Sequence, residues 1–413
     1  MRRADQQPSR RAFLGTAGAV VAVGGAAGCD AHSQSHAASD TSQAQAQAHA
    51  QAQSTPADTS VPPTGRYQAG VIVPQPAQPN LLAVVADIDD EAAVGPLLAE
   101  LGKTVLALTA GTEPRLLGLA PGDLTITVGV GPGVVRKASA AGAASTNNTD
   151  ASTNANAALP GSADLPQFSR EEIVPQARGG DLLIQLCAGD ALVLPVAAAA
   201  LLDQAGARVT ERWRQSARRG PNTPVAPGRA APRNLLGFID GIIGPTTTAE
   251  QQSDLWLAGP APVAGGTIAV VRRMELDLTR FAALSVPEQE AVFGRRRATG
   301  VPLSGGTIAS NPDLGAKTPD GRYLIPADAH ARRAHANVVG VGLMLRRSYS
   351  IDDPKPGLLF ISFQNDLHTF TATLTHMDDS DALLAFTTTT ASATFLILPG
   401  FDAEHALGST LFG

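Results

Sequence analysis

The chain has 413 residues, of which 44% are hydrophobic, 16% are charged and only 4% are aromatic. This length predicts about two domains, and a net charge of −6 lacks the basic excess that nucleic-acid binding needs. Two cysteines are too few for a disulfide scaffold or for a four-thiolate zinc or iron–sulfur site.

The N-terminal residues are typical of an export signal. Ser9-Arg10-Arg11-Ala12-Phe13-Leu14 is a twin-arginine pattern, and the Gly- and Ala-rich run after it is short for a membrane-spanning helix. We therefore expect residues 1–29 to be a twin-arginine signal peptide. The protein is then expected to be extracellular, periplasmic or on the outer face of the cell membrane. Because this route exports folded proteins, it also favours a cofactor that is inserted before export.

Two interpretations of Cys29 stay open. Ala26-Ala27-Gly28-Cys29 is similar to a lipoprotein cleavage site without its usual Leu, which would leave a lipid anchor at Cys29. Ordinary cleavage in the Ala-rich stretch is the alternative. Residues 30–65 are rich in Ala, Gln and Ser and are predicted to be a disordered linker. The second cysteine, Cys187, has the apolar neighbours Leu182, Leu183, Ile184 and Leu186 and is expected to be a buried thiol.

From about Leu81 the chain alternates strand-like and helix-like stretches. Residues 124–130 alternate apolar residues with Thr and Gly, which predicts a half-buried strand. Residues 138–163 are mostly small and polar, which predicts a flexible surface insertion. The remaining predicted elements of this half are strands at 81–86 and 182–187, a helix over 91–101 and a helix after Pro195.

The second half repeats this rhythm. Ser285 and Glu288 form a capping-box pattern for a helix that runs towards Gly294. Strands are predicted at 267–271, 358–363 and 394–398. Without a Gly-rich phosphate loop, the pattern predicts two α+β units, with a boundary near residues 218–232.

Histidine and aspartate are the informative residue types. Five histidines lie beyond the linker, and none belongs to an HExxH or paired-cysteine pattern, which disfavours a zinc enzyme. A single histidine can still bind a haem iron, although a lone histidine is more often structural. Asp240 lies between glycines in an apolar segment, which indicates either a plain turn or a bend that points a carboxylate into a cavity. The five histidines are His330, His335, His368, His376 and His405.

Several segments, in the right order, together resemble one family. Gly237-Phe238-Ile239-Asp240-Gly241 resembles the G-x-x-D-G signature of dye-decolorizing (DyP-type) haem peroxidases. Residues 325–332 resemble the proximal-histidine segment of that family, and residues 343–349 its distal-arginine segment. Residues 123–129 and 180–185 are similar to strands of its N-terminal half. The resemblance spans roughly residues 66 to 413, and it points to the exported twin-arginine branch of deferrochelatase- and peroxidase-like members.

The resemblance implies an α+β fold of two ferredoxin-like domains related by duplication, at residues 66–225 and 226–413, with haem b in the second. It implies a peroxidase that reduces hydrogen peroxide and oxidises bulky phenolic or dye-like donors. By position, His330 is the proximal iron ligand, Asp240 the distal acid–base and Arg346 the cation that stabilises the leaving oxygen. The haem-lining residues implied are Gly241, Ile242, Ile243, His335, Ala336 and Asn337, and Asp381 is a weaker candidate for the carboxylate that bonds to His330.

The chain departs from the family pattern at three places. After Asp240-Gly241 the family has Thr and then Asn-Pro, whereas this chain has Ile242-Ile243-Gly244-Pro245. The interval from His330 to Arg346 is about two residues short, which leaves Arg347 as an alternative distal arginine. His335 replaces the family's Asn in Asn-Pro and is a minority alternative for the axial ligand.

Three functions stay open on the sequence. The first is the peroxidase described above, with Tyr349 as either an electron relay or a core aromatic residue. The second is a haem-handling iron-uptake protein that releases iron from haem, as a deferrochelatase does. The third is a haem-binding protein with negligible peroxidase activity. The sequence also leaves a homo-oligomer open.

Overall fold

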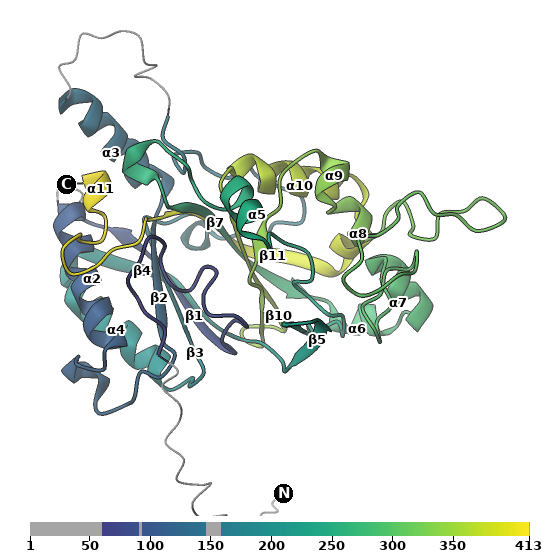
Figure 1. Cartoon of the computed structure of the whole chain (residues 1–413), viewed down its shortest axis with the longest axis horizontal. Helices are drawn as coiled ribbons and strands as arrows, with labels where there is room; N and C mark the ends of the chain where they lie inside the picture. Colours follow the sequence, from purple (N-terminus) through teal and green to yellow (C-terminus); the bar gives the residue numbers. More distant parts are fainter. Residues whose placement is uncertain (1–59, 91–92, 146–157, 413) are drawn as a thin grey trace, which may run out of the picture. The chain divides into compact units, whose positions relative to one another are not determined.

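The N-terminal half forms one antiparallel sheet covered by helices on one face (Figure 1). The structure is a computed structural model that describes residues 60–90, 93–145 and 158–412. The signal peptide, Cys29 and most of the predicted linker lie outside these residues. The elements are β1 (Asn80–Ile88), α2 (Val94–Thr109), β2 (Thr125–Val130), α3 (Pro132–Ser145), β3 (Leu182–Ala188), α4 (Val193–Ala205) and β4 (Val209–Arg218).

The strands of this half follow the order β2-β3-β1-β4, and every pairing is antiparallel. With the crossing helices α2 and α4, this is the ferredoxin-like order. The helix predicted over 91–101 starts at Val94 and continues to Thr109, because Val105 and Leu108 extend the same buried stripe. The insertion predicted over 138–163 is partly wrong, since residues up to Ser145 belong to α3.

The C-terminal half repeats the same arrangement. Its main strands follow the order β11-β7-β10-β9, with α10 packed on the outer face. The predicted capping box is confirmed, since Ser285 and Glu288 cap α7 and Gly294 ends it with a positive φ. The elements are β7 (Thr267–Leu276), α6 (Leu278–Ala282), α7 (Val286–Phe293), α8 (His330–Arg333), α9 (Ala336–Val339), β8 (Leu345–Arg346), β9 (Tyr349–Ile351), β10 (Gly357–Gln364), α10 (Leu367–Ser380), η6 (Ala382–Phe386) and β11 (Thr387–Ile397).

The two halves close into one barrel. Strand β11 pairs with β2 at Leu396↔Val130, and β4 pairs with β9 at Arg218↔Ser350, while β7 pairs with β10. The α+β fold of duplicated ferredoxin-like halves is therefore confirmed. Residues 58–413 form a single compact unit, and the boundary predicted at 218–232 falls on a hairpin between the halves. The hairpin consists of β5 (Asn222–Ala226) and β6 (Arg229–Pro232).

Three apolar clusters hold these layers together. One lies inside the barrel and includes Trp213, Tyr349 and Phe363. A second lies between the N-terminal sheet and α2 and α4, and a third lies under α10. The expectation that residues 124–130 form a half-buried strand is wrong, because every residue of β2 is buried. The hydroxyl of Thr127 instead donates to the carbonyl of Ala69, so the segment before β1 covers the polar face.

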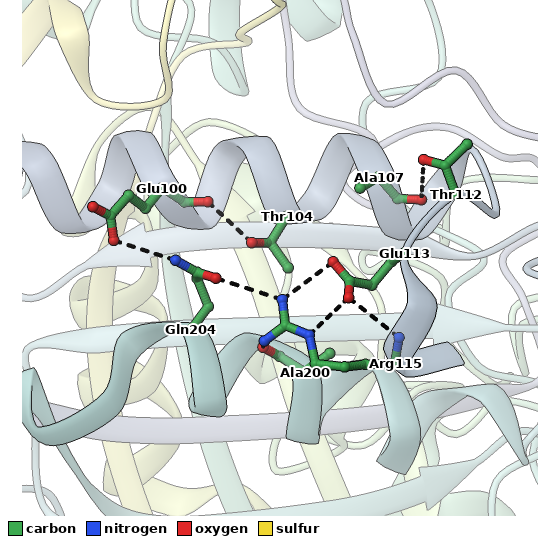
Figure 2. A network of polar contacts seen from close by, with 8 residues as sticks. All are labelled: Glu100, Thr104, Ala107, Thr112, Glu113, Arg115, Ala200 and Gln204. Atoms are coloured by element: carbon green, nitrogen blue, oxygen red, sulfur yellow. Dashed lines mark hydrogen bonds and ion pairs between the residues drawn. The ribbon is translucent and has the colours of Figure 1, made fainter. Parts of the chain in front are cut away.

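A polar network joins the two outer helices of the N-terminal half (Figure 2). Arg115 donates to Glu113 at 2.7 Å and to the carbonyl of Ala200 on α4 at 2.9 Å. Gln204 on α4 donates to Glu100 on α2 at 3.4 Å. The bond from Arg115 lowers the pKa of the Glu113 carboxyl. These contacts fix the outer layer on the side of the barrel away from α10.

The remaining features of the described residues are a buried cysteine, a buried residue ahead of the predicted first domain, and the short helices. Cys187 is buried in the barrel cluster as a free thiol, as predicted. Val61 is also buried, so ordered structure begins before residue 66. None of the described helices is both long and apolar enough to cross a membrane. The short helices are η2 (Pro114–Leu116), η3 (Pro175–Ala177), η4 (Gly206–Arg208), α5 (Thr248–Asp254), η5 (Ala261–Val263) and α11 (Ser409–Phe412).

Candidate active site

The imidazole of His330 is held by a buried carboxylate. Its Nδ1 lies 2.8 Å from Oδ2 of Asp381, whose side chain is fully buried. The other oxygen of Asp381 accepts the N–H of Leu383 at 2.8 Å, because Asp381 is the N-cap of η6. Since a carboxylate only accepts hydrogen bonds, the imidazole donates through Nδ1, and the neutral tautomer that does so has its lone pair on Nε2. The pairing predicted for Asp381 is confirmed, and the His330 side chain is 28% exposed.

Hydrogen bonds shape the turn that carries Asp240. Asn234 Oδ1 accepts two backbone N–H groups of the turn, at 3.1 and 3.2 Å. Gly237 and Gly241 have φ of 84° and 71°, a conformation that favours glycine at both ends of the motif. Asp240 Oδ1 accepts the N–H of Gly241 at 2.7 Å. This bond orients the half-buried carboxylate.

Stacked aromatic rings connect this turn to His330. Phe238 stacks on Phe293, with ring centroids 3.7 Å apart, and Phe293 meets the His330 ring edge-on at 6.1 Å. Gly294 packs directly on the His330 segment, since a Cβ there would lie 3.0 Å from Ile325. The Asp240 turn and His330 therefore belong to one packed region, although they are 90 residues apart in the sequence.

Arg346 and Arg347 point to opposite faces of the sheet. Arg347 is buried and donates to the carbonyls of Gly70 and Val71, both at 2.7 Å, on the inner side of the barrel. Arg346 lies on the outer side, where its Nη2 is 3.5 Å from the carbonyl of Ile243. Its Nε is buried and has no hydrogen-bond partner in the part of the chain that the structure describes. Successive side chains of a strand alternate between faces, which explains the divergence. Of these two arginines, Arg346 is therefore the one near the segment that follows Asp240.

Arg295 is a residue of this region that the sequence analysis missed. Its Nη1 donates to the carbonyls of Gly300 and Ile308, and within the described residues it forms no ion pair with a carboxylate. Burial, with the nearby charge of Arg346, lowers the pKa of Arg295 to about 10. In the sequence Arg295 begins a run of three arginines, which resembles an ordinary solvated charge cluster.

His335 lies beside Arg295 and is half-buried. Burial, and then the charge of Arg295, lower the pKa of His335, so its imidazole favours the neutral form. Its Nδ1 is buried without a hydrogen-bond partner among the described residues. It lies at the N-cap of α9 and, unlike His330, is bonded to no carboxylate of the described residues.

The other residues predicted to line the cofactor are not equivalent. Ile243 is half-buried, whereas Ile242 is 5% exposed and packs with Val225, Ala231 and Ile239. Ala336 and Asn337 open the short helix α9, and Asn337 is exposed. Both members of the altered Ile-Ile pair therefore pack with Val225, Ala231 and Ile239, and Ile243 is the more exposed of the two.

The donor set fits a haem. Half-buried apolar side chains suit a flat macrocycle, His330 offers a ring nitrogen with a lone pair, and the guanidinium groups of Arg295 and Arg346 suit its carboxylates. Among the described residues no three His, Cys, Asp or Glu side chains are grouped to hold a bare metal ion. Met344 and Phe360 are half-buried apolar residues of this outer face, and Ile243 is half-buried beside Arg346.

The aromatic residues considered as relays lie elsewhere. Tyr349 is 1% exposed inside the barrel, and its hydroxyl donates to the carbonyl of Gln78 at 3.0 Å, so it is a core aromatic residue. Burial raises the pKa of its phenol. Tyr323 is 46% exposed beside an open hollow of about 590 Å³ on the loop before His330. That hollow contains neither Asp240 nor Arg346.

Both halves of the chain are similar to known proteins. Residues 68–217 match the model of the N-terminal part of DyP-type peroxidases, and residues 231–402 match that of the C-terminal part. The chain is 31% identical over 379 residues to a dye-decolorizing peroxidase of Thermobifida fusca, covering 84% of each protein. It is 28% identical over 379 residues to a deferrochelatase of Shigella boydii, covering 84% of this chain and 86% of that protein. The oxyferrous complex of DtpA from Streptomyces lividans superposes with a TM-score of 0.74 at 29% identity, over 87% of this chain and all of that one.

Proposed function

Because the chain belongs to the DyP-type peroxidase family, whose members are oxidoreductases acting on peroxide, we propose that it is a haem b peroxidase that oxidises bulky phenolic or dye-like donors. One observation carries the proposal. The bond between His330 and Asp381 uses Nδ1 and leaves the other ring nitrogen, on a side chain that is 28% exposed, to bind an iron. The oxyferrous state of the DtpA relative supports an iron cofactor here as well.

Four residues would hold the cofactor. His330 Nε2 binds the iron, and Asp381 makes the imidazole more basic through its bond to Nδ1. Arg295 and Arg346 supply positive charge for the two carboxylates of the porphyrin. When bound, haem supplies an iron that takes oxidising equivalents from peroxide and passes them to an electron donor.

Asp240 moves the proton. Hydrogen peroxide must lose a proton from one oxygen, and its other oxygen must gain one to leave as water. A single oriented carboxylate can accept the first proton and donate it to the departing oxygen. The bond from the Gly241 N–H keeps the Asp240 carboxylate in place for both steps.

Arg346 stabilises charge. The departing oxygen gains negative charge as the O–O bond breaks, and a fixed guanidinium nearby lowers the energy of that state. The Nε–H of Arg346 is buried and has no hydrogen-bond partner among the described residues, so it can donate in this role. Because an ordinary carboxylate keeps its charge well below pH 7, a carboxylate base stays usable in acid, and we expect turnover with bulky dyes to be best below neutral pH.

The proposal is tested with four variants of the holoprotein. His330→Ala is expected to lose the haem absorption band of the wild type, whereas His335→Ala keeps it. Asp240→Asn is expected to bind haem and react with peroxide about 100–10,000-fold more slowly. The rate constant for the reaction with peroxide is expected to fall about 100–1,000-fold in Arg346→Leu. Wild-type spectra in His330→Ala, or wild-type peroxide kinetics in Asp240→Asn, would contradict it.

A second candidate function is the release of iron from haem. The relatives named deferrochelatase, at 28% identity, favour it. Incubation of the holoprotein with a reductant would then produce the fluorescence of metal-free porphyrin. A preparation that reacts with peroxide and yields no such fluorescence would exclude iron release and support the peroxidase function.

We also propose that the protein is exported by the twin-arginine route, on the pattern around Arg10 and Arg11. Replacing both with lysine is expected to keep the protein in the cytoplasm in a cell-fractionation experiment. An unchanged distribution would contradict this.

A further inference from the structure

Arg219 is a charged residue near the site that no step above uses. It follows β4, and its backbone N–H donates to the carbonyl of Pro79 at 2.8 Å. Its guanidinium carbon lies 5.2 Å from the centroid of the Tyr349 ring. Its Nε is buried and has no hydrogen-bond partner among the described residues. An unpaired charge in such a position is costly, so its neighbours matter.

Arg219 shares a cavity with Asp240. Both residues line a small cavity of about 10 Å³, comparable to the space that one water occupies. Asp240 is the acidic residue of that lining. A Cβ on Gly241, the residue after Asp240, would lie 3.8 Å from Nη2 of Arg219. The charge of Asp240 also raises the pKa of Arg219 against the larger lowering effect of burial.

The other arginine of the cavity is already occupied. Arg233 donates to the carbonyls of Gly237, Arg297 and Ala298 at 2.6 to 2.8 Å, and so it supports the backbone of the turn. The backbone carbonyl of Arg346 also lies near this turn, 3.9 Å from a Cβ on Gly241. Three arginines therefore lie around the Asp240 turn, and Arg219 is the one that lines the cavity with Asp240 and is not bonded to the carbonyls of the turn.

We propose that Arg219 is a positioning residue of the distal site, whose charge acts on Asp240 across the cavity and keeps the carboxylate ionised in acid. The proposal rests on the proposed function, in which Asp240 is the base for peroxide. A cation a few ångströms away favours the ionised form of a carboxylate, and this effect survives in a half-buried cavity. Arg219 thereby extends the reaction to lower pH without touching peroxide.

The test is the pH dependence of the peroxide reaction in Arg219→Gln holoprotein. The acid limb of the profile is the range in which the rate constant falls as the pH is lowered. In Arg219→Gln this limb is expected to move up by about half to one pH unit, while the rate constant near neutral pH stays the same. Well below the limb the rate constant then falls about three- to tenfold. Arg219→Lys keeps the charge and is expected to keep the wild-type limb. The matched control is Arg218→Gln, because the adjacent Arg218 pairs with Asp352 at 2.7 Å in solvent.

A second readout does not depend on turnover. The absorption spectrum of the resting holoprotein is recorded as the pH is lowered. The pH at which the spectrum changes is expected to move up by the same amount in Arg219→Gln. In an Asp240→Asn background the Arg219 change should have no further effect on either curve. If Arg219→Gln does not accumulate, Arg219→Met keeps the aliphatic stem against Tyr349 and serves instead.

The outcomes separate the two proposals. An unmoved acid limb in Arg219→Gln, with Asp240→Asn still inactive, overturns the role of Arg219 and leaves the proposed function intact. An active Asp240→Asn overturns the base assignment itself. If the acid limb of the pH profile moves equally in Arg218→Gln, the shift comes from the net charge of the protein, and the proposal is overturned as well.

Discussion

Neighbouring residues of one type do different work in this protein. Arg346 faces the outer side of the sheet, whereas Arg347 bonds to two carbonyls on the inner side. Arg295 is half-buried near Arg346, while the next residue, Arg296, forms an ion pair with Glu290 at 2.8 Å and is largely exposed. The direction of each side chain decides its role, and that direction follows from the local backbone.

The buried partner of His330 leads to the first prediction. Asp381→Asn keeps an oxygen that can accept the Leu383 N–H but removes the negative charge beside the imidazole. We expect a folded protein whose haem affinity or peroxide rate falls about 10–100-fold. Haem titration and stopped-flow mixing with peroxide measure the two quantities.

The chain has a matched control for this change. His405 and Asp402 form a second histidine–carboxylate pair at 3.1 Å, but the histidine side chain is 75% exposed. Asp402→Asn is expected to leave haem affinity and peroxide rate unchanged. Equal losses in both variants would show that the effect of Asp381 has nothing to do with the site.

At the scale of elements, the seam between β2 and β11 depends on a side chain. The two strands pair only at Val130 and Gly129. The amide of Gln68, which is 3% exposed, bonds to the N–H and carbonyl of Val128 and to the carbonyl of Leu398 at 2.8 to 2.9 Å. A side chain from the segment before β1 thus replaces missing ladder bonds.

The second prediction follows from that seam. Gln68→Ala leaves buried backbone groups without partners, and we expect it to lower the free energy of unfolding by about 2–4 kcal/mol. Urea unfolding of the holoprotein measures the change. Gln252→Ala, which removes one exposed bond to the Tyr67 hydroxyl, should change it by less than about 0.5 kcal/mol. A similar small effect in Gln68→Ala would mean that the strands hold the seam by themselves.

At the scale of the whole molecule, the two halves share one barrel. Each half contributes four strands to the closed order, and the inner cluster takes side chains from both. A half expressed alone would expose strand edges at β2 and β4 and the inner apolar face. Neither half therefore has a complete core of its own.

The third prediction is that the halves unfold together. Trp213 reports on the N-terminal half when Trp256, the other tryptophan, is replaced by Phe. Its fluorescence and the haem absorption band, which reports on the C-terminal half, are expected to change at the same urea concentration. Two clearly separated midpoints would contradict the shared core.

Local patterns in the sequence determined much of this molecule. The helix capped by Ser285 and Glu288 and the strands around residues 81–86 and 182–187 follow from capping and apolar spacing, which act between near neighbours. The order of the motifs around Asp240 and His330 likewise carries the family resemblance. These features need no knowledge of what packs against them.

Only the tertiary structure decided which distant groups meet. It assigns Asp381 to His330 across 51 residues, Gln68 to Leu398 across 330, and Arg219 to the cavity of Asp240. It also corrected β2, whose Thr alternation suggested a solvent face although another segment covers it. Such contacts depend on closure of the barrel, which brings together chain segments whose spacing along the sequence holds no record of their distance in space.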